Sequence, residues 1–361
     1  MANFFIRHKD DPRTPVQHSD DIFEEYLQLN NVKNMMGRKD SGMPIILDYG
    51  FEGEAGDTKR FHFIPQNDTP GIHGQNATIL GNEDSLDEYY CDLFIDVMAK
   101  AFRRKGDMTK QRIIWNFRTI GKQQLVNWFA KKNETLLFAA LTGRLGDGGN
   151  QPDYASTKQL VFGDGRIISS NGGTGVTEIT PANSTDSYLL GNVGAADKMS
   201  TAVLDELEYL AKKGNSKYRI APFRLSNGQE YFKFLISLKA AKDLRQDARW
   251  QSHALSKVQA GLGAKDMIAD GALGIWNNII VESNERVETV TNAAGSLTLA
   301  HNLLLGANAA VLGWAKTTDY TEEEGDHKRF LSMAGTEIRG QRKITFDDVD
   351  IGAAQVITSS M

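Results

Sequence analysis

The segment from Met108 to Leu141 constrains the fold of this chain more than any other part of its sequence. Apolar residues recur there every three or four positions, the spacing of one helical face: Ile113, Ile114, Phe117, Ile120, Leu125, Trp128, Phe129, Leu136 and Ala140. Asp107 is a suitable N-cap, and Thr142-Gly143 is a suitable stop. At 1.5 Å per residue, the predicted helix would be roughly 50 Å long. Few catalytic domains need a rod of that length, so the pattern favours a structural spine.

The first 42 residues predict an extended arm. They are polar and mixed in charge, and they contain Pro12 and Pro15. One short helical pattern lies near Asp21–Leu29. With so few apolar residues, this segment is not expected to form a core of its own.

Residues 44–64 predict a β-hairpin. Apolar residues alternate with less apolar ones from Ile45 to Phe51, and again from Lys59 to Ile64, with a glycine-bearing turn between the two runs. Residues 65–85 then form a long return that is rich in Gly, Asn and Pro. Because an isolated hairpin is marginally stable in water, something outside it must hold it in place.

Leu86–Phe102 predicts one long strand with a single buried face, because its side chains alternate in character. Tyr89, Cys91 and Leu93 begin the side predicted to be buried. Cys91 is the only cysteine, so no intramolecular disulfide can form. Burial beside a carboxylate raises a thiol pKa and lowers its reactivity, so a packed and unreactive cysteine is expected.

The rest of the chain predicts loops, a compact α+β lobe over 199–285 and a set of short strands. Residues 143–198 are rich in Gly, Ser, Asn and Asp and predict loops. The lobe is predicted to contain a helix from Ser200 to Lys213, strands 218–223 and 231–236, helices 238–250 and onward to 262, and a strand 275–281. An apolar segment 303–314 follows, then an acidic loop 321–326 and short strands near 330–333, 337–339, 344–346 and 353–357.

The charge balance argues against sequence-specific DNA binding. Lys and Arg total 41 and Asp and Glu total 46, a formal net charge of −5, and no basic stripe is evident. The start of the chain lacks the apolar stretch of a signal peptide, and no window approaches the ~20 apolar residues of a membrane helix. We therefore expect a protein that is made and kept in a cytoplasm and has no membrane partner.

No pattern in the sequence predicts catalysis, a cofactor or a metal ion. Phosphate-binding glycine loops, nucleophile elbows and zinc-binding histidine pairs are all missing from the sequence. The seven histidines are scattered, and only His62 and His73 flank one predicted loop. The acidic clusters at 322–324 and 347–350 lie in polar surroundings, so solvated loops are expected there.

Four segments carry a resemblance to a known family: the spine segment, from Asp107–Arg112 through Trp115-x-x-Arg118 to Phe138–Gly143, the helix Leu238–Trp250, and Leu305–Ala309 and Gly335–Gly340 near the end. In these segments and in the order of its elements, the chain resembles the Hong Kong 97-like fold of tailed-bacteriophage major capsid proteins, and within it the coat protein family of N4-type phages. The resemblance covers residues 40–360.

This resemblance implies an α+β fold in five parts: an N-terminal arm (1–42), an extended E-loop (43–85), a first part of the P-domain (86–198) with the spine helix (108–141), an A-domain (199–296) and the P-domain return strands (297–361). It also implies a major capsid protein that self-assembles through pentamers and hexamers into an icosahedral head shell around double-stranded DNA, which it contacts non-specifically. Scaffolding, portal and decoration proteins are further implied partners. The shell would be assembled in the host bacterial cytoplasm and end in the virion.

The predicted hairpin carries the candidate contacts between subunits: Phe51, Lys59, Arg60, Phe61 and Phe63. Some members of the fold join a lysine to an asparagine of a neighbour, but no motif here marks Lys59 or a partner for that chemistry. Two other functions remain open at this point. One is an encapsulin-like compartment, which shares the fold, and the other is a cytoplasmic α+β enzyme whose site is assembled from distant residues.

Overall fold

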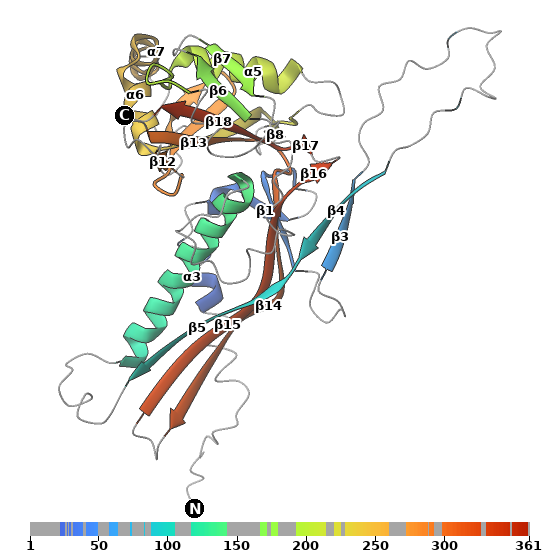
Figure 1. The fold of residues 1–361 in the computed structure, drawn as a ribbon, viewed down its shortest axis with the longest axis vertical. Helices are drawn as coiled ribbons and strands as arrows, with labels where there is room; N and C mark the ends of the chain where they lie inside the picture. The colour runs from blue at the N-terminus through green and yellow to red at the C-terminus, as the bar shows by residue number, and fades with distance from the viewer. Residues whose placement is uncertain are drawn as a thin grey trace, which may run out of the picture.

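The computed structural model has two lobes, which meet at the end of one long helix (Figure 1). It describes residues 22–25, 27, 29, 32–38, 41–49, 58–63, 73, 83, 88–104, 117–142, 167–171, 175–179, 193–213, 220–224, 228–259, 272–287, 289–291, 298–325, 330–346 and 349–359. None of the helices in these ranges is both long and apolar enough to cross a membrane.

The spine helix α3 spans Phe117–Thr142 and ends where the sequence predicts. Its predicted start at Asp107 lies outside the described residues. The first half of α3 buries one face, which includes Leu125 and Phe129. From Leu136 onward every residue of the helix is buried, because this end lies between the two lobes (Figure 1).

A five-stranded sheet packs against α3 and has the order β1-β2-β14-β15-β5. Its strands are β1 (Met36–Arg38), β2 (Ile45–Asp48), β14 (Ala310–Gly325), β15 (Phe330–Lys343) and β5 (Asp96–Arg104). β15 pairs antiparallel with both β14 and β5. β2 pairs with β14 only over Ala310–Gly313. Beyond this short pairing, the described sheet consists of three strands, β14, β15 and β5, which form a narrow ribbon.

The second lobe is a nine-stranded sheet with helices packed on it. Its main path is β10-β11-β9-β13-β18-β6-β7, with β12 on β13 and β8 on β9. The strands are β6 (Ile167–Asn171), β7 (Gly175–Ile179), β8 (Phe223–Arg224), β9 (Glu230–Ile236), β10 (Ala272–Trp276), β11 (Ile279–Ser283), β12 (Thr289–Thr291), β13 (Thr298–Leu305) and β18 (Ala353–Ser359). Its helices α5 (Thr201–Lys213), α6 (Leu238–Gln246) and α7 (Ala248–Gln259) include the predicted helix capped by Ser200, whose Oγ accepts from the Val203 amide.

The remaining strands form two small pairs. β3 (Thr58–Phe63) and β4 (Tyr89–Phe94) make an antiparallel hairpin that pairs with neither large sheet. β16 (Thr345–Phe346) pairs with β17 (Val349–Asp350). Near the start of the described chain, a one-turn helix η1 (Lys33–Met35) precedes β1.

The predicted hairpin within residues 44–64 is wrong. β2 lies in the five-stranded sheet, where it pairs with β1 and β14, and β3 pairs with β4 instead. The alternation correctly marked both strands, but it carries no information on the partner. Ile45 and Ile46 are both buried, and β2 reaches these buried positions by pairing with the distant β14.

Several other predictions also fail. The single strand 86–102 is interrupted at Ile95, and the buried side changes there: Cys91 and Leu93 are buried before the break and Met98 after it, while Val97 is 59% exposed. The loops predicted over 143–198 contain β6 and β7, and the strand 275–281 is the hairpin β10–β11, which turns through Asn277 at φ 47. The helix predicted over 238–250 breaks at Asp247, and β8 is only two residues long.

The C-terminal strands are longer than predicted. The acidic loop 321–326 is the end of β14 as far as Gly325, and the short strands 330–333 and 337–339 are one strand, β15. The alternation of β15 was hidden because Glu337 and Arg339 occupy buried positions. In the predicted acidic loop 347–350, Asp350 is buried and both of its carboxylate oxygens lie 3.0 Å from Nζ of Lys343.

The described residues of the arm between 22 and 38 pack onto their own subunit. Ile22, Val32 and Met35 are buried in the core of their own subunit, and Phe23 makes an edge contact with Trp314 at 5.5 Å between ring centroids. This segment is apolar at only a few positions, but they coincide with the space between α3 and the sheet. Residues 1–20 lie outside the described part of the chain.

Candidate functional site: the hairpin β3–β4 and its anchor

The hairpin β3–β4 has one face that is fixed in the subunit core. Phe61, Cys91 and Leu93 are all buried on this face. Phe61 and Leu93 pack with Ile46, Val311 and Ile344, which come from the five-stranded sheet and the segment that follows it. A hairpin that is unstable alone is therefore held by the body of its own subunit.

Cys91 confirms the prediction of a buried cysteine. It is 2% exposed, and burial is the main reason that the pKa of its thiol is raised above the ordinary value. Because the thiolate is the reactive form, this position disfavours redox or nucleophilic chemistry.

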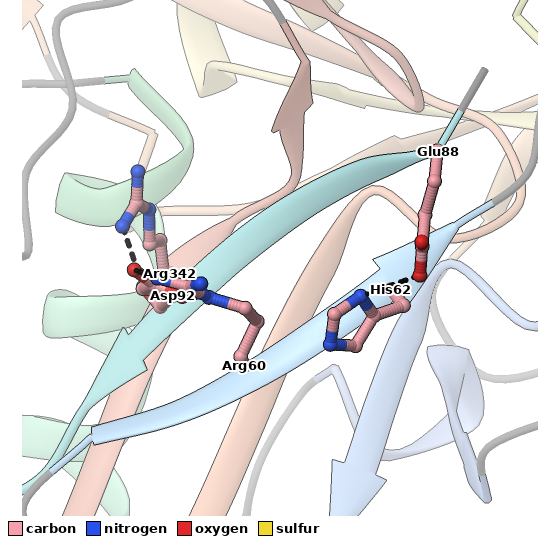
Figure 2. Close-up of polar contacts among 5 residues, drawn as sticks. All are labelled: Arg60, His62, Glu88, Asp92 and Arg342. Carbon is pink, nitrogen blue, oxygen red and sulfur yellow. Dashed lines mark hydrogen bonds and ion pairs between the residues drawn. The ribbon is translucent and has the colours of Figure 1, made fainter.

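The opposite face of the hairpin carries charges. Arg60 forms a two-point ion pair with Asp92 across the strands, with Nε at 2.7 Å from Oδ1 and Nη2 at 3.0 Å from Oδ2 (Figure 2). The guanidinium also lies over the Tyr90 ring, 4.1 Å from its centroid. This hydrogen bonding lowers the pKa of Asp92 and raises that of Arg60.

Arg342 of β15 ties the hairpin to the five-stranded sheet. Its Nη1 donates to the backbone carbonyl of Asp92, and Figure 2 shows Arg342 and Arg60 on either side of that residue. Further along the hairpin, Nδ1 of His62 lies 2.7 Å from Oε1 of Glu88, and both side chains are more than half exposed. The exposed face thus holds an ordered set of charges.

The five residues predicted as contacts lie in different environments. Arg60 is exposed, with 51% of its side chain accessible. Lys59 is bound to Asp48 of β2 at 2.8 Å, whereas Phe61 is buried in the subunit itself. Phe63 ends β3. Phe51 lies outside the described residues.

Sequence reasoning missed Asp92 and Arg342 as parts of this site. Asp92 was expected only as a neighbour of Cys91, but the antiparallel register places it opposite Arg60. Arg342 is 250 residues away from Asp92 in the chain. No local pattern signals such a contact, because it depends on how β4 crosses β15.

In the described part of the chain, no group of three or more His, Cys, Asp and Glu side chains could hold a metal ion. His73, which the sequence placed near His62 across one loop, is exposed. What the hairpin offers is a rigid surface of charges and an aromatic ring, which suits protein contact.

A sequence model of the family described as phage capsid protein matches residues 10–360. The chain belongs to the phage capsid protein family. The major capsid protein of Pseudomonas phage KPP25 is 26% identical to it over 302 residues, which are 77% of this chain and 75% of the relative.

Solved structures of phage capsids share the fold. The capsid of Ralstonia phage GP4 gives a TM-score of 0.71 at 21% identity, covering 91% of this chain and 90% of that chain. The capsid asymmetric unit of cyanophage Pam1 gives 0.70 at 21% identity, covering 91% and 92%. The predicted Hong Kong 97-like, α+β fold is confirmed, while the narrower assignment to N4-type coat proteins stays a prediction. This phage capsid protein is a structural protein of the virion, and its predicted function as the major capsid protein of the head shell is confirmed.

Proposed function

We propose that copies of this capsid protein assemble through pentamers and hexamers into an icosahedral shell around double-stranded DNA, with each β3–β4 hairpin lying against a neighbouring copy. The observation that carries the proposal is the two-sided hairpin. Its inner face is fixed by Phe61 and Leu93, and its outer face holds Arg60 in an ordered ion pair with Asp92. Arg60 and the Tyr90 ring beneath it are of the two residue types, Arg and Tyr, that are enriched in contact surfaces between proteins.

The five-part division of the chain is part of this proposal. The arm (1–42), the E-loop (43–85), the P-domain (86–198 and 297–361) and the A-domain (199–296) follow the family's plan. In the described structure, β6, β7, β13 and β18 pair in the same sheet as β9. We therefore propose that the P-domain and the A-domain share this sheet, which runs without interruption from one domain into the other.

Among the predicted contact residues, Arg60 is the most accessible candidate. Lys59 keeps 27% of its side chain exposed beside Asp48 and is the second candidate. Phe61 supports the hairpin from within, so its effect on a neighbour would be indirect. Phe51 and Phe63 stay in the proposal on the strength of their sequence positions.

The protein is proposed to act without catalysis and without a cofactor. DNA would be contacted non-specifically and weakly, because a net charge of −5 gives little general attraction to phosphate. Assembly in the host cytoplasm, with scaffolding, portal and decoration proteins as partners, follows the family's plan. The family match favours this function over an encapsulin-like compartment or a cytoplasmic enzyme.

Expression of the full chain tests the proposal. Sedimentation velocity and negative-stain images of the purified protein should show large closed particles together with capsomer-sized oligomers. A discrete monomer at every concentration would overturn the proposal. Particles that carry a specific cargo protein in place of nucleic acid would favour the compartment alternative.

A further inference from the structure

The distal end of the five-stranded sheet is a narrow ribbon of three described strands. It lies at the end of the molecule opposite the second lobe (Figure 1), in the order β14-β15-β5. Met333 of β15 is buried against the spine helix, with Leu125 and Phe129. On the other face, Val97, Ala99 and Ala101 of β5 are exposed. This end of the subunit therefore has one uncovered face and two outer strands.

The outer strand β14 ends in an acidic edge. Glu322, Glu323 and Glu324 are consecutive and exposed. Arg118 of the spine helix lies 3.0 Å from Glu322 and 3.6 Å from Glu324, so it offsets part of this charge. Glu323 points to the opposite face, because its register partner is Ser332 and not the buried Met333.

The outer strand β5 ends in a basic edge. Lys100, Arg103 and Arg104 lie over aromatic rings of the same subunit: Arg103 over Phe330 at 4.6 Å, and Arg104 over Phe117 at 5.9 Å. Lys100 lies 5.7 Å from the Trp128 ring centroid. Within the described ranges, none of these three cations forms an ion pair with a carboxylate.

The two edges do not satisfy each other within one chain. β15 lies between them, with Ser332 paired to Glu323 on one side and to Arg103 on the other. Two inter-strand spacings separate the Cα atoms of Glu323 and Arg103 by about 10 Å. In the described part of the chain no ion pair joins the two edges, and the guanidinium of Arg103 lies over the Phe330 ring instead.

We propose that this ribbon is a contact between two copies of the chain, in which the acidic edge of one copy, Glu322–Glu324, lies against the basic edge of the next, Lys100, Arg103 and Arg104. The inference rests on the proposed assembly into a shell and adds the surface and its polarity. Because the edges differ, the contact is head to tail, the type that closes into rings when the rotation permits. Opposite charges on the two edges favour this pairing and oppose acid-to-acid or base-to-base contacts.

Charge reversal tests the proposal. Arg103→Glu or Glu323→Arg alone places like charges across every contact, so we expect the yield of closed particles to fall about tenfold or more. The double variant Arg103→Glu/Glu323→Arg exchanges the two charges and should recover most of the yield. Lys131→Glu makes the same charge change on an exposed position of the spine helix and serves as the control.

A disulfide experiment separates contacts between chains from contacts within one chain. Thr321 and Ala101 are exposed on the uncovered face and both pair with Ala334. Thr321→Cys/Ala101→Cys keeps all the edge charges. About 10 Å between the two Cα atoms is too far for a disulfide within one chain, and the native Cys91 is buried. Assembled particles should therefore give a ladder of covalent multimers on a non-reducing gel.

The outcomes are distinct. The proposed contact is overturned if both single reversals give the wild-type yield of closed particles, or if the double variant does not recover that yield. If the charge-exchanged variant recovers its particle yield but the cysteine variant gives no ladder of covalent multimers, the two charges interact within one chain. This outcome also overturns the proposed contact. In each of these cases the wild-type chain still forms particles. If the wild type itself remains monomeric, the proposed shell function fails instead.

Discussion

The cores of the two lobes are built from different kinds of residue. In the core of the nine-stranded sheet and its helices, Phe232, Phe234 and Leu244 are fully buried, and the fully buried polar side chains of Asn302 and Thr358 are uncharged and hydrogen-bond to each other. Between the spine helix and the five-stranded sheet, by contrast, Asn133, Glu337 and Arg339 are all at most 1% exposed. Nη1 of Arg339 donates to Oδ1 of Asn133 at 2.9 Å, and its Nε lies 3.6 Å from Glu337.

This difference indicates different roles for the two cores. An apolar core gains stability from burial and tolerates some repacking. A buried charge pair adds little net stability over apolar residues, but removing one partner is costly. We infer that the polar contacts under the spine helix fix the register of that helix on the five-stranded sheet. The lobe of the spine helix also leaves one face of the β14-β15-β5 ribbon uncovered.

Arg339→Met should be the most destabilising of the changes considered. It removes a buried cation that lies 3.6 Å from the buried carboxylate of Glu337, and breaking such a buried pair costs about 3–5 kcal/mol of unfolding free energy. In the second lobe, Lys233→Met should cost less, because Lys233 and its partner Glu282 each keep 10% of their side chains exposed. Urea unfolding of the unassembled subunit measures both. Equal losses would break the comparison between the lobes.

The double variant Arg339→Met/Glu337→Leu sharpens this prediction. With both charges removed, the penalty of an isolated buried carboxylate disappears, so much of the stability should return. If the double variant is as unstable as Arg339→Met, the loss comes from packing around Asn133 and Met98, and the charges matter little.

Gly340→Ala should have the next largest effect, again in the lobe of the spine helix. A Cβ at this position would lie 1.9 Å from the carbonyl oxygen of Phe94, where β15 passes the junction of β4 and β5. Backbone must move to relieve such a contact, which costs about 2–3 kcal/mol. Gly325→Ala is the matched control, since a Cβ there meets nothing within 4 Å. Equal unfolding midpoints for the two variants would contradict this account.

Part of the fold follows from local sequence, and the errors in strand pairing have a clear physical cause. The cap at Ser200 was predicted correctly because it depends on neighbours in the chain, and the burial of Cys91 because the alternation of β4 marks its buried side. Strand pairing depends on distant partners, so the sequence could not place β3 against β4. For the candidate site, Arg60 was identified from its position on a strand, but the anchor at Arg342 could not be identified.

Asp247→Ala, in the second lobe, should have an intermediate effect. The Asp247 carboxylate accepts from the amide and the hydroxyl of Thr201, both at 2.7 Å, and from the Arg249 amide at 2.9 Å, so it caps two helices. Loss of such a cap costs about 1–2 kcal/mol. Asp247→Asn keeps an acceptor and should lose less.

The same variant has a signature in pH. Burial raises the pKa of Asp247, but the hydrogen bonds from Thr201 and Arg249 lower it more, so the folded pKa lies below the ordinary value. The contribution of Asp247 is therefore fully present above its unfolded pKa of about 4 and is lost as pH falls through the folded pKa. The stability gap between wild type and Asp247→Ala should be wide at neutral pH and narrow in acid. A gap independent of pH would show that the charge of the carboxylate is not involved.

Arg60→Met should change the stability of the isolated subunit least. The pair with Asp92 is largely exposed, and such pairs are screened by salt and contribute little to folding. The core contacts of Phe61 and Leu93 remain in this variant and still hold the hairpin. Its effect should fall on assembly, because it removes the charge that the hairpin presents to a neighbour. We expect an unchanged urea midpoint together with a several-fold lower yield of closed particles, measured by sedimentation. A lower midpoint with normal assembly would mean that the hairpin charges stabilise the subunit, and that this surface belongs with the structural polar contacts under the spine helix.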